Sequence, residues 1–306
     1  MKIIHVALGT PELDRSATEL GHTVARIPWR SMLGRRIATD QVARLNSHIL
    51  RVANDMKPDV VFCQLQTPGI MWHRTVNDLR GMGALVINWC GDVRDPIPQW
   101  YIDDAAAFDI TAFSNMTDVE LVRAAGHRAE YLQIGYDETI YSPGTAVRSG
   151  VVFMGQNSGD RFPLSRARAQ MVQAMREEFG HSFEAYGNGW GTTHLHADAE
   201  VDTYRRALIA INFDHFVRPR FASDRILRAQ ACGACTVSQW YEGIELEHPD
   251  VPAARTINDM VEMVRELLTT PEVAIKLGQR QARHVRASHT WHDRINTIQQ
   301  WLDTLS

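Results

Sequence analysis

A segment in the last third of the chain combines a helix start with arginines, and this combination could bind a diphosphate. Ser223 or Asp224 can cap a helix that is predicted over Arg225–Ala231. The first N–H groups of a helix have no acceptor within the helix, so they favour an anion at that end. Arg220 and Arg225 add positive charge beside this helix start. The segment predicts an anion site, and the open alternative is an ordinary loop–helix–strand unit.

Two other loops of the same half carry residues suited to a nucleotide. Gly155 ends a predicted strand, where the backbone can approach a phosphate closely, and Arg161 lies on the loop that follows. Tyr186, Asn188 and Trp190 belong to a Tyr-Gly-Asn-Gly-Trp run whose glycines also permit close approach. Arg161 is either a phosphate contact or a solvated loop residue. Trp190 either stacks on a base or fills the core.

One acidic residue of the first half is a candidate for contacting an attacking hydroxyl group. Asp92 follows a predicted strand, Ala84–Trp89, so it is expected at the carboxyl edge of a parallel sheet. There its carboxylate could accept the proton of a hydroxyl group or orient that group. Aspartate is also a common turn residue, and this alternative stays open.

The chain is mildly acidic overall, but one segment of the first half is strongly basic. The formal net charge is −4, so binding to nucleic acid through bulk charge is not implied. Within Arg26–Arg51, however, there are six arginines and one acidic residue. Arg30, Arg35 and Arg36 could contact the phosphates of an anionic acceptor, and Trp29 could stack on a base or pack in the core. The alternative is a solvated arginine surface.

These residues are positioned by a regular alternation of short apolar segments and amphipathic segments. The apolar segments are typical of buried parallel strands, and the amphipathic ones are typical of helices. The alternation predicts an α/β fold with parallel sheets that helices cover on both faces. The expected strands are Lys2–Leu8, His22–Ile27, Val60–Gln64, Ala84–Trp89, Asp109–Ser114, Ala129–Ile134, Val151–Met154, Phe183–Tyr186, Leu208–Phe213 and Ala234–Ser238.

A turn-rich connector divides this alternation into two halves. Gly135–Gly144 has the glycine, proline, aspartate and serine content of a linker, and the alternation begins again after it. A length of 306 residues also suggests two domains. In the first half, Thr117 and Glu120 have the spacing of a capping box and predict a helix start.

Several of these segments resemble parts of the GT-B glycosyltransferases, in particular the CgeB-like and GT4-type enzymes. The matching segments are Val151–Gly155 with Arg161, Tyr186–Trp190, Arg225–Gly233 and His289–Arg294. The resemblance covers most of the chain and implies two doubly wound, Rossmann-like domains that face each other across a cleft. It implies an acceptor-side domain over residues 1–141, completed by a final helix over 289–306, and a nucleotide-sugar-binding domain over 142–288.

The resemblance also implies how the donor would be bound. Arg161, Arg220 and the N–H groups around Ser223–Arg225 would contact the diphosphate, and the base would lie near Tyr186–Trp190.

One position departs from the family pattern. Arg228 stands where retaining enzymes of this kind commonly carry a glutamate. It could pair with Asp224 one helical turn earlier, or it could be a further phosphate ligand. Glu242 or Glu245 could then contact the sugar hydroxyls instead.

The function that the resemblance implies is a glycosyltransferase (EC 2.4 class) that uses a nucleotide-diphosphate sugar such as a UDP-sugar. If the reaction retains configuration, Asp92 would orient the acceptor hydroxyl rather than deprotonate it, although Asn88–Asp92 carries glycine where the family usually has histidine. The acceptor could be a saccharide, a small molecule or a hydroxylated base in DNA. The alternatives are a GT-B sugar-nucleotide epimerase and a non-catalytic nucleotide-sugar-binding protein.

No metal and no cofactor besides the nucleotide sugar is expected. Cys232 and Cys235 have the spacing of a metal or redox pair, but no second pair accompanies them, and His194 and His196 are similarly isolated. The motifs of P-loop enzymes, dinucleotide oxidoreductases and α/β-hydrolases are absent from the sequence. Four cysteines, no signal peptide and no apolar run of membrane-spanning length predict a cytoplasmic protein without a membrane span.

Overall fold

The computed structural model describes residues 1–34, 36–192 and 194–305, and they form two compact units. The first unit comprises Met1–Ile134 and the segment from Trp291 onward, and the second comprises Gly135–Thr290. The connector after residue 134 belongs to the second unit, where Tyr136 and Thr290 form a parallel bridge. The sequence predicts this boundary at residue 141, because turn chemistry does not show which unit a connector packs against.

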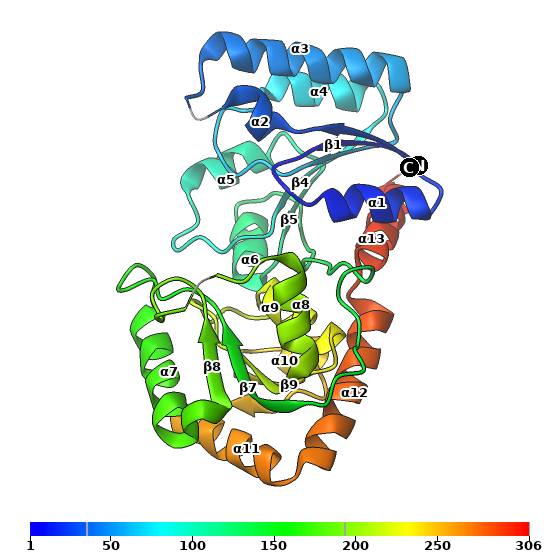
Figure 1. Cartoon of the computed structure of the whole chain (residues 1–306). Helices are drawn as coiled ribbons and strands as arrows, with labels where there is room; N and C mark the ends of the chain where they lie inside the picture. Colours follow the sequence, from blue (N-terminus) through cyan, green and yellow to red (C-terminus); the bar gives the residue numbers. More distant parts are fainter. Residues whose placement is uncertain (35, 193, 306) are drawn as a thin grey trace. The chain divides into compact units, whose positions relative to one another are not determined.

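The first unit contains a six-stranded parallel sheet in the order β2-β1-β3-β4-β5-β6 (Figure 1). This confirms the predicted α/β alternation. The strands are β1 (Lys2–Val6), β2 (Thr23–Ile27), β3 (Val60–Cys63), β4 (Leu85–Cys90), β5 (Ile110–Phe113) and β6 (Ala129–Tyr131). The helices are α1 (Pro11–Glu19), α2 (Trp29–Leu33), α3 (Thr39–Met56), α4 (His73–Gly81), α5 (Gln99–Ala105), α6 (Met116–Ala124) and α13 (Trp291–Leu305).

Helices cover both faces of this sheet with separate apolar cores. α2, α3 and α4 pack on one face, and α1 and α13 pack together on the other (Figure 1). In the second core, Trp291 of α13 meets Trp89 edge to face, with ring centroids 5.8 Å apart. Ile295, one turn further along α13, is fully buried. The last helix of the chain therefore completes the core of the first unit.

The second unit contains a five-stranded parallel sheet in the order β11-β10-β9-β7-β8 (Figure 1). The strands are β7 (Ser149–Met154), β8 (Phe183–Tyr186), β9 (Ala207–Asn212), β10 (Cys235–Gln239) and β11 (Ala253–Ala254). The helices are α7 (Ser165–Phe179), the 3-10 turn η1 (Gly180–Ser182), α8 (Ala197–Arg206), α9 (Asp224–Ala231), α10 (Ile244–Glu247), α11 (Ile257–Thr269) and α12 (Pro271–Ser288).

The strand order of the second sheet gives it a switch point. β8 follows β7 in the sequence and pairs with one edge of it, whereas β9 pairs with the other edge. The loops that leave β7 and β9 therefore diverge to opposite faces and leave a crevice at their carboxyl ends. Ligands of open α/β sheets bind in such crevices.

Three details of the first unit differ from the sequence-based prediction. α2 and α5 are short helices in segments where no helix was expected. The capping box predicted for α6 at Thr117 is wrong, because Asn115 is the N-cap and its side chain accepts a hydrogen bond from the Asp118 N–H. Asparagine caps as well as threonine, so the spacing alone did not decide between them.

Among the described residues, every helix is too short or too polar to cross a membrane.

Candidate functional site

The candidate site lies at the carboxyl ends of β7 and β9, the switch point of the second sheet. Gly155 follows β7 there, and its lack of a side chain is required. A Cβ at this position would lie 2.8 Å from the Phe153 ring and 3.3 Å from Nη1 of Arg168. Gly155 therefore allows a buried arginine to pack directly beneath the loop.

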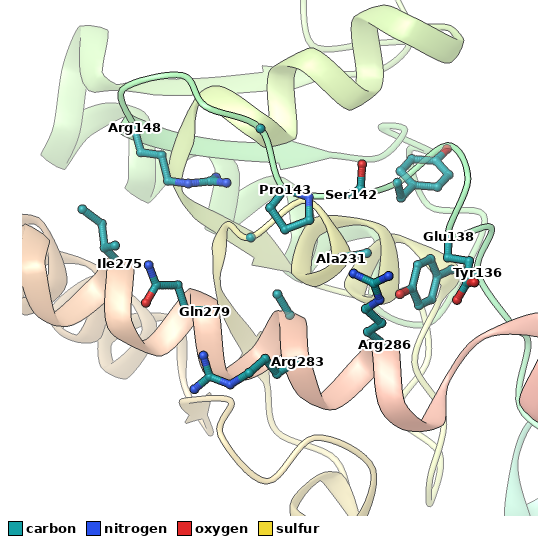
Figure 2. Close-up of a pocket in the computed structure, with 14 residues that line it drawn as sticks. Tyr136, Glu138, Ser142, Pro143, Arg148, Ala231, Ile275, Gln279, Arg283 and Arg286 are labelled. Atoms are coloured by element: carbon teal, nitrogen blue, oxygen red, sulfur yellow. The ribbon is translucent and has the colours of Figure 1, made fainter.

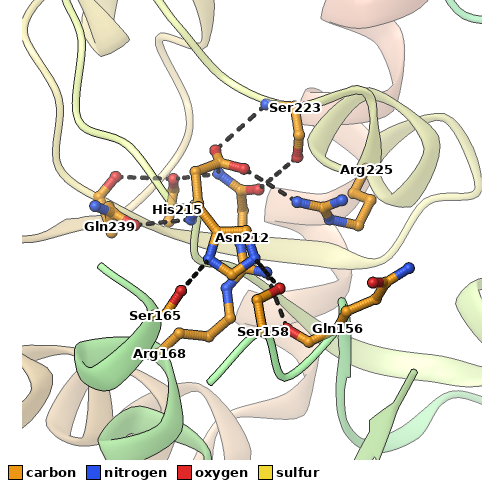
Figure 3. A network of polar contacts seen from close by, with 11 residues as sticks. Gln156, Ser158, Ser165, Arg168, Asn212, His215, Ser223, Arg225 and Gln239 are labelled. Atoms are coloured by element: carbon orange, nitrogen blue, oxygen red, sulfur yellow. Dashed lines mark hydrogen bonds and ion pairs between the residues drawn. The ribbon is translucent and has the colours of Figure 1, made fainter. Parts of the chain in front are cut away.

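Arg168, near the start of α7, is the central residue of the site. Its side chain is 1% exposed. Its Nη1 donates to Nε2 of His215 at 2.7 Å and to the carbonyl oxygen of Gln156 at 3.3 Å (Figure 3). Its Nε and Nη2 have no hydrogen-bond partner among the residues that the structure describes. A buried donor without an acceptor costs about 1–3 kcal/mol, more if charged, so an anionic ligand here would remove a penalty.

The charges around Arg168 act on both its pKa and that of His215. Burial and the charge of Arg225 lower the pKa of Arg168 to about 9. Burial and the two arginines lower the pKa of His215 from 6.5 to about 4. His215 is therefore neutral at pH 7, and its Nε2 is free to accept from Arg168. The pKa of His215 is lower in the folded protein than in the unfolded chain. Its contribution to the free energy of unfolding is therefore present above pH 6.5 and is lost as the pH falls towards 4.

A second arginine reaches the site from the start of α9. Arg225 donates through Nη2 to Oδ1 of Asp214 at 3.2 Å, and the Asp214 side chain is buried (Figure 3). Ser223, one of the two residues suggested by the sequence, is the N-cap of α9, but its side chain makes no capping hydrogen bond. Its backbone N–H donates to Oδ2 of Asp214 at 3.3 Å. The helix start thus faces the same polar cluster as Arg168.

Two amides hold the Asp214 carboxylate and backbone in place. Oε1 of Gln239 accepts from the backbone N–H of Asp214 at 2.8 Å, and Nδ2 of Asn212 donates to Oδ2 of Asp214 at 3.1 Å. Together Arg168, Arg225, Asp214 and the neutral His215 leave one net positive charge. A cluster with that charge and unpaired guanidinium N–H groups is arranged to bind an anion.

The two other arginines that the sequence suggested have different surroundings. Arg161 is exposed, its guanidinium lies 5.1 Å from the centre of the Phe162 ring, and within the described chain it forms no ion pair. It is therefore accessible to a ligand. Arg220 donates through Nε to Oε1 of the buried Glu247 at 2.7 Å. The charge of Arg220 near the α9 start is therefore balanced by Glu247, and its predicted contact with a diphosphate stays a prediction.

The structure decides between the two alternatives for Arg228. Its Nη2 lies 2.6 Å from Oδ2 of Asp224, and its Nη1 donates to Oε1 of Glu200 at 3.2 Å. Arg228 is therefore held by two carboxylates, and the Asp224 pairing is the alternative that the structure supports. Glu200 lies on α8, far away in the sequence, so its part in this cluster could not be foreseen.

The Tyr186–Trp190 segment is attached to the loop after β7. Trp190 is 8% exposed, and its Nε1 donates to the carbonyl oxygen of Gly155 at 2.6 Å. It therefore fills the core, and stacking of Trp190 on a base does not fit the structure. Gly187 has a φ of 133°, and a Cβ there would lie 2.2 Å from the same carbonyl oxygen. Asn188 is exposed, and its backbone carbonyl accepts from Asn157 at 2.9 Å.

Three further residues predicted to bind the donor lie at or near the surface of the second unit. The Tyr186 hydroxyl donates to Oε2 of Glu184 at 3.0 Å, so it is engaged within the protein. Glu242 and Glu245 are exposed and form no side-chain hydrogen bond with any described residue. The structure leaves these two carboxylates available for hydroxyl groups, and their predicted role stays a prediction.

Asp92 lies in the first unit, just beyond the carboxyl end of β4. Its side chain is exposed and, within the described residues, has no hydrogen bond or ion pair. An aspartate that serves a turn usually accepts backbone hydrogen bonds. This position therefore fits a carboxylate that is available to a substrate.

The basic segment of the first unit is less accessible than its sequence suggested. Trp29 is 1% exposed, and its Nε1 donates to the carbonyl oxygen of Gln64 at 3.1 Å, so it cannot stack on a base. Two of the six arginines, Arg26 and Arg44, form ion pairs with aspartates. Arg30 and Arg36 are exposed. Arg35, predicted to contact the acceptor, lies outside the described residues.

The two cysteines Cys232 and Cys235 are free and buried. Burial raises the pKa of both Cys232 and Cys235 to about 12, so both are thiols rather than reactive thiolates at neutral pH. The described part of the chain contains no cluster of three or more histidine, cysteine, aspartate or glutamate side chains that could hold a metal ion.

Sequence reasoning missed Arg168, Asp214 and His215, although one signal was available. On α7, Met171, Val172 and Met175 are the buried apolar residues, and Arg168 occupies the same stripe three and four residues earlier. A charged residue on the buried stripe of an amphipathic helix indicates either a functional or a paired cation.

Part of the chain is similar in sequence to known glycosyltransferases. A model of the family described as "Glycosyl transferase-like" matches residues 166–300, which include most of α7, all of α9 and the first part of α13. In sequence, none of the curated proteins matches this chain.

Several solved structures share the architecture of the chain. A structure described as trehalose-6-phosphate from E. coli bound with UDP-2-fluoro glucose has a TM-score of 0.65 at 10% identity, covering 99% of each chain. A glycosyltransferase from Rickettsia africae has a TM-score of 0.63 at 10% identity, covering 99% of this chain and 98% of its own. TarM has a TM-score of 0.62 at 9% identity over 86% of this chain, which spans only 58% of TarM. At these identities the likeness shows the fold, which is the GT-B fold.

Proposed function

We propose that this protein is a glycosyltransferase that binds a nucleotide-diphosphate sugar in its second unit. The observation that carries the proposal is the pair of unpaired N–H groups on buried Arg168, beside Arg225 and the start of α9. This arrangement supports a diphosphate ligand, because two guanidinium groups and a helix start all favour a dianionic group. The glycosyl transferase-like family match and the GT-B fold support the same reading.

In this proposal the protein acts mainly by stabilising the departing diphosphate. Arg168 and Arg225 face charge that grows on the diphosphate as the bond to the sugar breaks, in a site where few other groups compete for it. Glu242 and Glu245 are the carboxylates proposed to contact the sugar hydroxyls. Asp92 is proposed to orient the acceptor hydroxyl. The resemblance to GT4-type enzymes favours retention of configuration, which NMR analysis of the product anomer would test.

Two separate observations support a proposal for the class of donor and for the compartment of the protein. A structural neighbour is described as bound with UDP-2-fluoro glucose, so we propose UDP-sugars as the first donors to test. No metal ion is part of the proposed donor site. The four cysteines are free and buried, which fits the reducing conditions of the cytoplasm.

Donor hydrolysis separates this proposal from its alternatives. A transferase should release the nucleoside diphosphate slowly from its correct donor when no acceptor is present. An epimerase would change the sugar while the nucleotide sugar stays intact, and a non-catalytic binder would leave it unchanged. Chromatography of each nucleotide sugar after long incubation distinguishes the three outcomes, and either of the last two would refute the transferase.

Replacing Arg225 by alanine should weaken binding of a nucleoside diphosphate by roughly 1–3 kcal/mol, the contribution of a charge-assisted hydrogen bond. The loss should be partial, because Arg168 remains. Isothermal titration calorimetry measures it directly. Arg280→Ala is the matched control, since Arg280 pairs with an aspartate on the surface of the same unit. Equal affinity in wild type and Arg225→Ala would exclude Arg225 from the site.

For the acceptor, we propose a saccharide hydroxyl rather than DNA, because Trp29 is buried and two arginines of the basic segment are ion-paired. Duplex DNA with hydroxymethylated bases should therefore show no specific binding at low salt. Binding that weakens with salt by roughly one log–log unit per phosphate would overturn this, provided that Arg30→Gln with Arg36→Gln flattens the slope. Fluorescence anisotropy at two salt concentrations gives the answer.

A further inference from the structure

A pocket of the second unit is lined by none of the residues of the proposed donor site. It has a volume of about 350 Å³, within the range of small-molecule sites. One wall is the connector that precedes β7, and the other is α12, with the end of α9 as the floor (Figure 2). Its lining residues are Tyr136, Glu138, Tyr141, Ser142, Pro143, Gly144, Arg148, Ala231, Gly233, Ile275, Gln279, Ala282, Arg283 and Arg286.

Arg148 is part of the wall rather than a ligand-binding group. Its Nη1 donates to the carbonyl oxygens of Tyr204 and Ala207, and its Nη2 donates to that of Cys232. Gly233 is needed beside it, because a Cβ there would lie 2.7 Å from Nη2 of Arg148. The guanidinium is thus fixed by backbone carbonyls, and it makes this end of the pocket rigid.

Two other arginines of the lining make no such hydrogen bonds. Arg283 and Arg286 are exposed on α12, and neither forms a hydrogen bond or an ion pair with any described residue. Figure 2 shows the Arg286 guanidinium extending from α12 towards the connector, near Tyr136 and Glu138. Glu138 is the one acidic residue of the lining, so the two available arginines leave the pocket with a positive balance.

The rest of the lining is mainly apolar. The apolar part of the lining comes from four residues, Tyr141, Pro143, Ala231 and Ile275. Ile275 is 38% exposed although it is a large aliphatic residue. An apolar hollow with unpaired cations at its edge matches one kind of ligand, an anionic group attached to an apolar body. The apolar part would cover Ile275 and the floor, while the anion would meet Arg283 and Arg286.

We propose that this pocket is a binding site for a small amphipathic anion, such as an aromatic or acyl carboxylate, sulfonate or phosphate. The proposal does not depend on the proposed donor site. The two walls are also the segments through which the chain passes from one unit to the other, after Ile134 and before Trp291.

The probe for the test is 8-anilinonaphthalene-1-sulfonate, an apolar sulfonate whose fluorescence rises in an apolar site. It should bind the wild-type protein, and Arg283→Gln with Arg286→Gln should weaken binding at least fivefold. Lys276→Gln, which removes a charge from the same helix outside the lining, should leave binding unchanged. Arg168→Gln should also leave it unchanged, which separates this pocket from the donor site.

A second variant and a neutral probe keep the test decisive. Ala282→Trp should fill the hollow and abolish the fluorescence increase, while the double arginine variant covers the case in which Ala282→Trp does not fold. N-phenyl-1-naphthylamine, which lacks the sulfonate, should bind at least fivefold more weakly than the sulfonate. Equal binding of the sulfonate to the double arginine variant and to Lys276→Gln would overturn the proposal, and so would equal binding of the two probes.

Discussion

Replacing Arg168 by glutamine should weaken the binding of a nucleoside diphosphate by on the order of 3 kcal/mol, roughly a hundredfold. The reason is that Nε and Nη2 of Arg168 are buried without a partner, so two charge-assisted hydrogen bonds to the ligand would be lost. Calorimetric titration of the purified variant measures the change. The loss of affinity should be larger than for Arg225→Ala, because Arg225 is partly exposed and already paired with Asp214.

The stability of the same variant gives an independent check. A buried cation with unpaired N–H groups destabilises the free protein, so Arg168→Gln should leave the thermal midpoint unchanged or raise it. A residue with a purely structural role would lower it. Arg166→Gln is the matched control, since Arg166 lies two residues away on α7 but is exposed and pairs with Asp160. If Arg168→Gln lowers the midpoint and leaves affinity unchanged, Arg168 is structural.

Replacing Asp92 by asparagine should lower turnover by roughly a hundredfold, the contribution of a group that positions the reacting hydroxyl, and leave donor affinity unchanged. The side chain keeps its shape but loses the charge that would orient the acceptor hydroxyl. Steady-state transfer rates and donor titration measure the two quantities separately. Asp95→Asn, in the same loop, is the control. Wild-type turnover in Asp92→Asn would return Asp92 to the role of a turn residue.

The fold could be predicted from the sequence because its signals are local. Short apolar strands, amphipathic helices and the connector at Gly135–Gly144 each appear within a few residues, and together they determine two parallel α/β units. The short helices α2 and α5 were missed because a helix of five or seven residues has no repeated apolar period. The packing of α13 in the first unit required the family resemblance.

The site was predictable only in part, because its decisive contacts join distant segments. The α9 start and Arg225 follow from local capping and charge, and both lie in the observed cluster. The pairing of Arg220 with Glu247 spans 27 residues, and that of Arg168 with His215 spans 47. Side-chain identity does not show which arginine is neutralised in the folded chain, so the sequence favoured Arg220 over Arg168.

The burial of Trp29 and Trp190 likewise could not be predicted from the sequence. Trp29 and Trp190 were equally suited to stacking and to core packing, since tryptophan has a large apolar ring and one donor. In the structure each indole N–H donates to a backbone carbonyl, and each ring is buried. The backbone acceptors that decide this are invisible in the sequence.

The central claim, that the second unit binds a nucleotide-diphosphate sugar at Arg168 and Arg225, is tested most directly by thermal shift. Wild-type protein and Arg168→Gln are heated with nucleosides, nucleoside diphosphates and nucleotide sugars. A ligand at a hundred times its Kd stabilises the native state by about 2.7 kcal/mol. Nucleoside diphosphates and at least one nucleotide sugar should therefore raise the wild-type midpoint by several degrees, nucleosides should not, and Arg168→Gln should lose the response. If none of these ligands raises the thermal midpoint of the wild type, or if they raise the midpoint of Arg168→Gln by the same amount, the claim is contradicted.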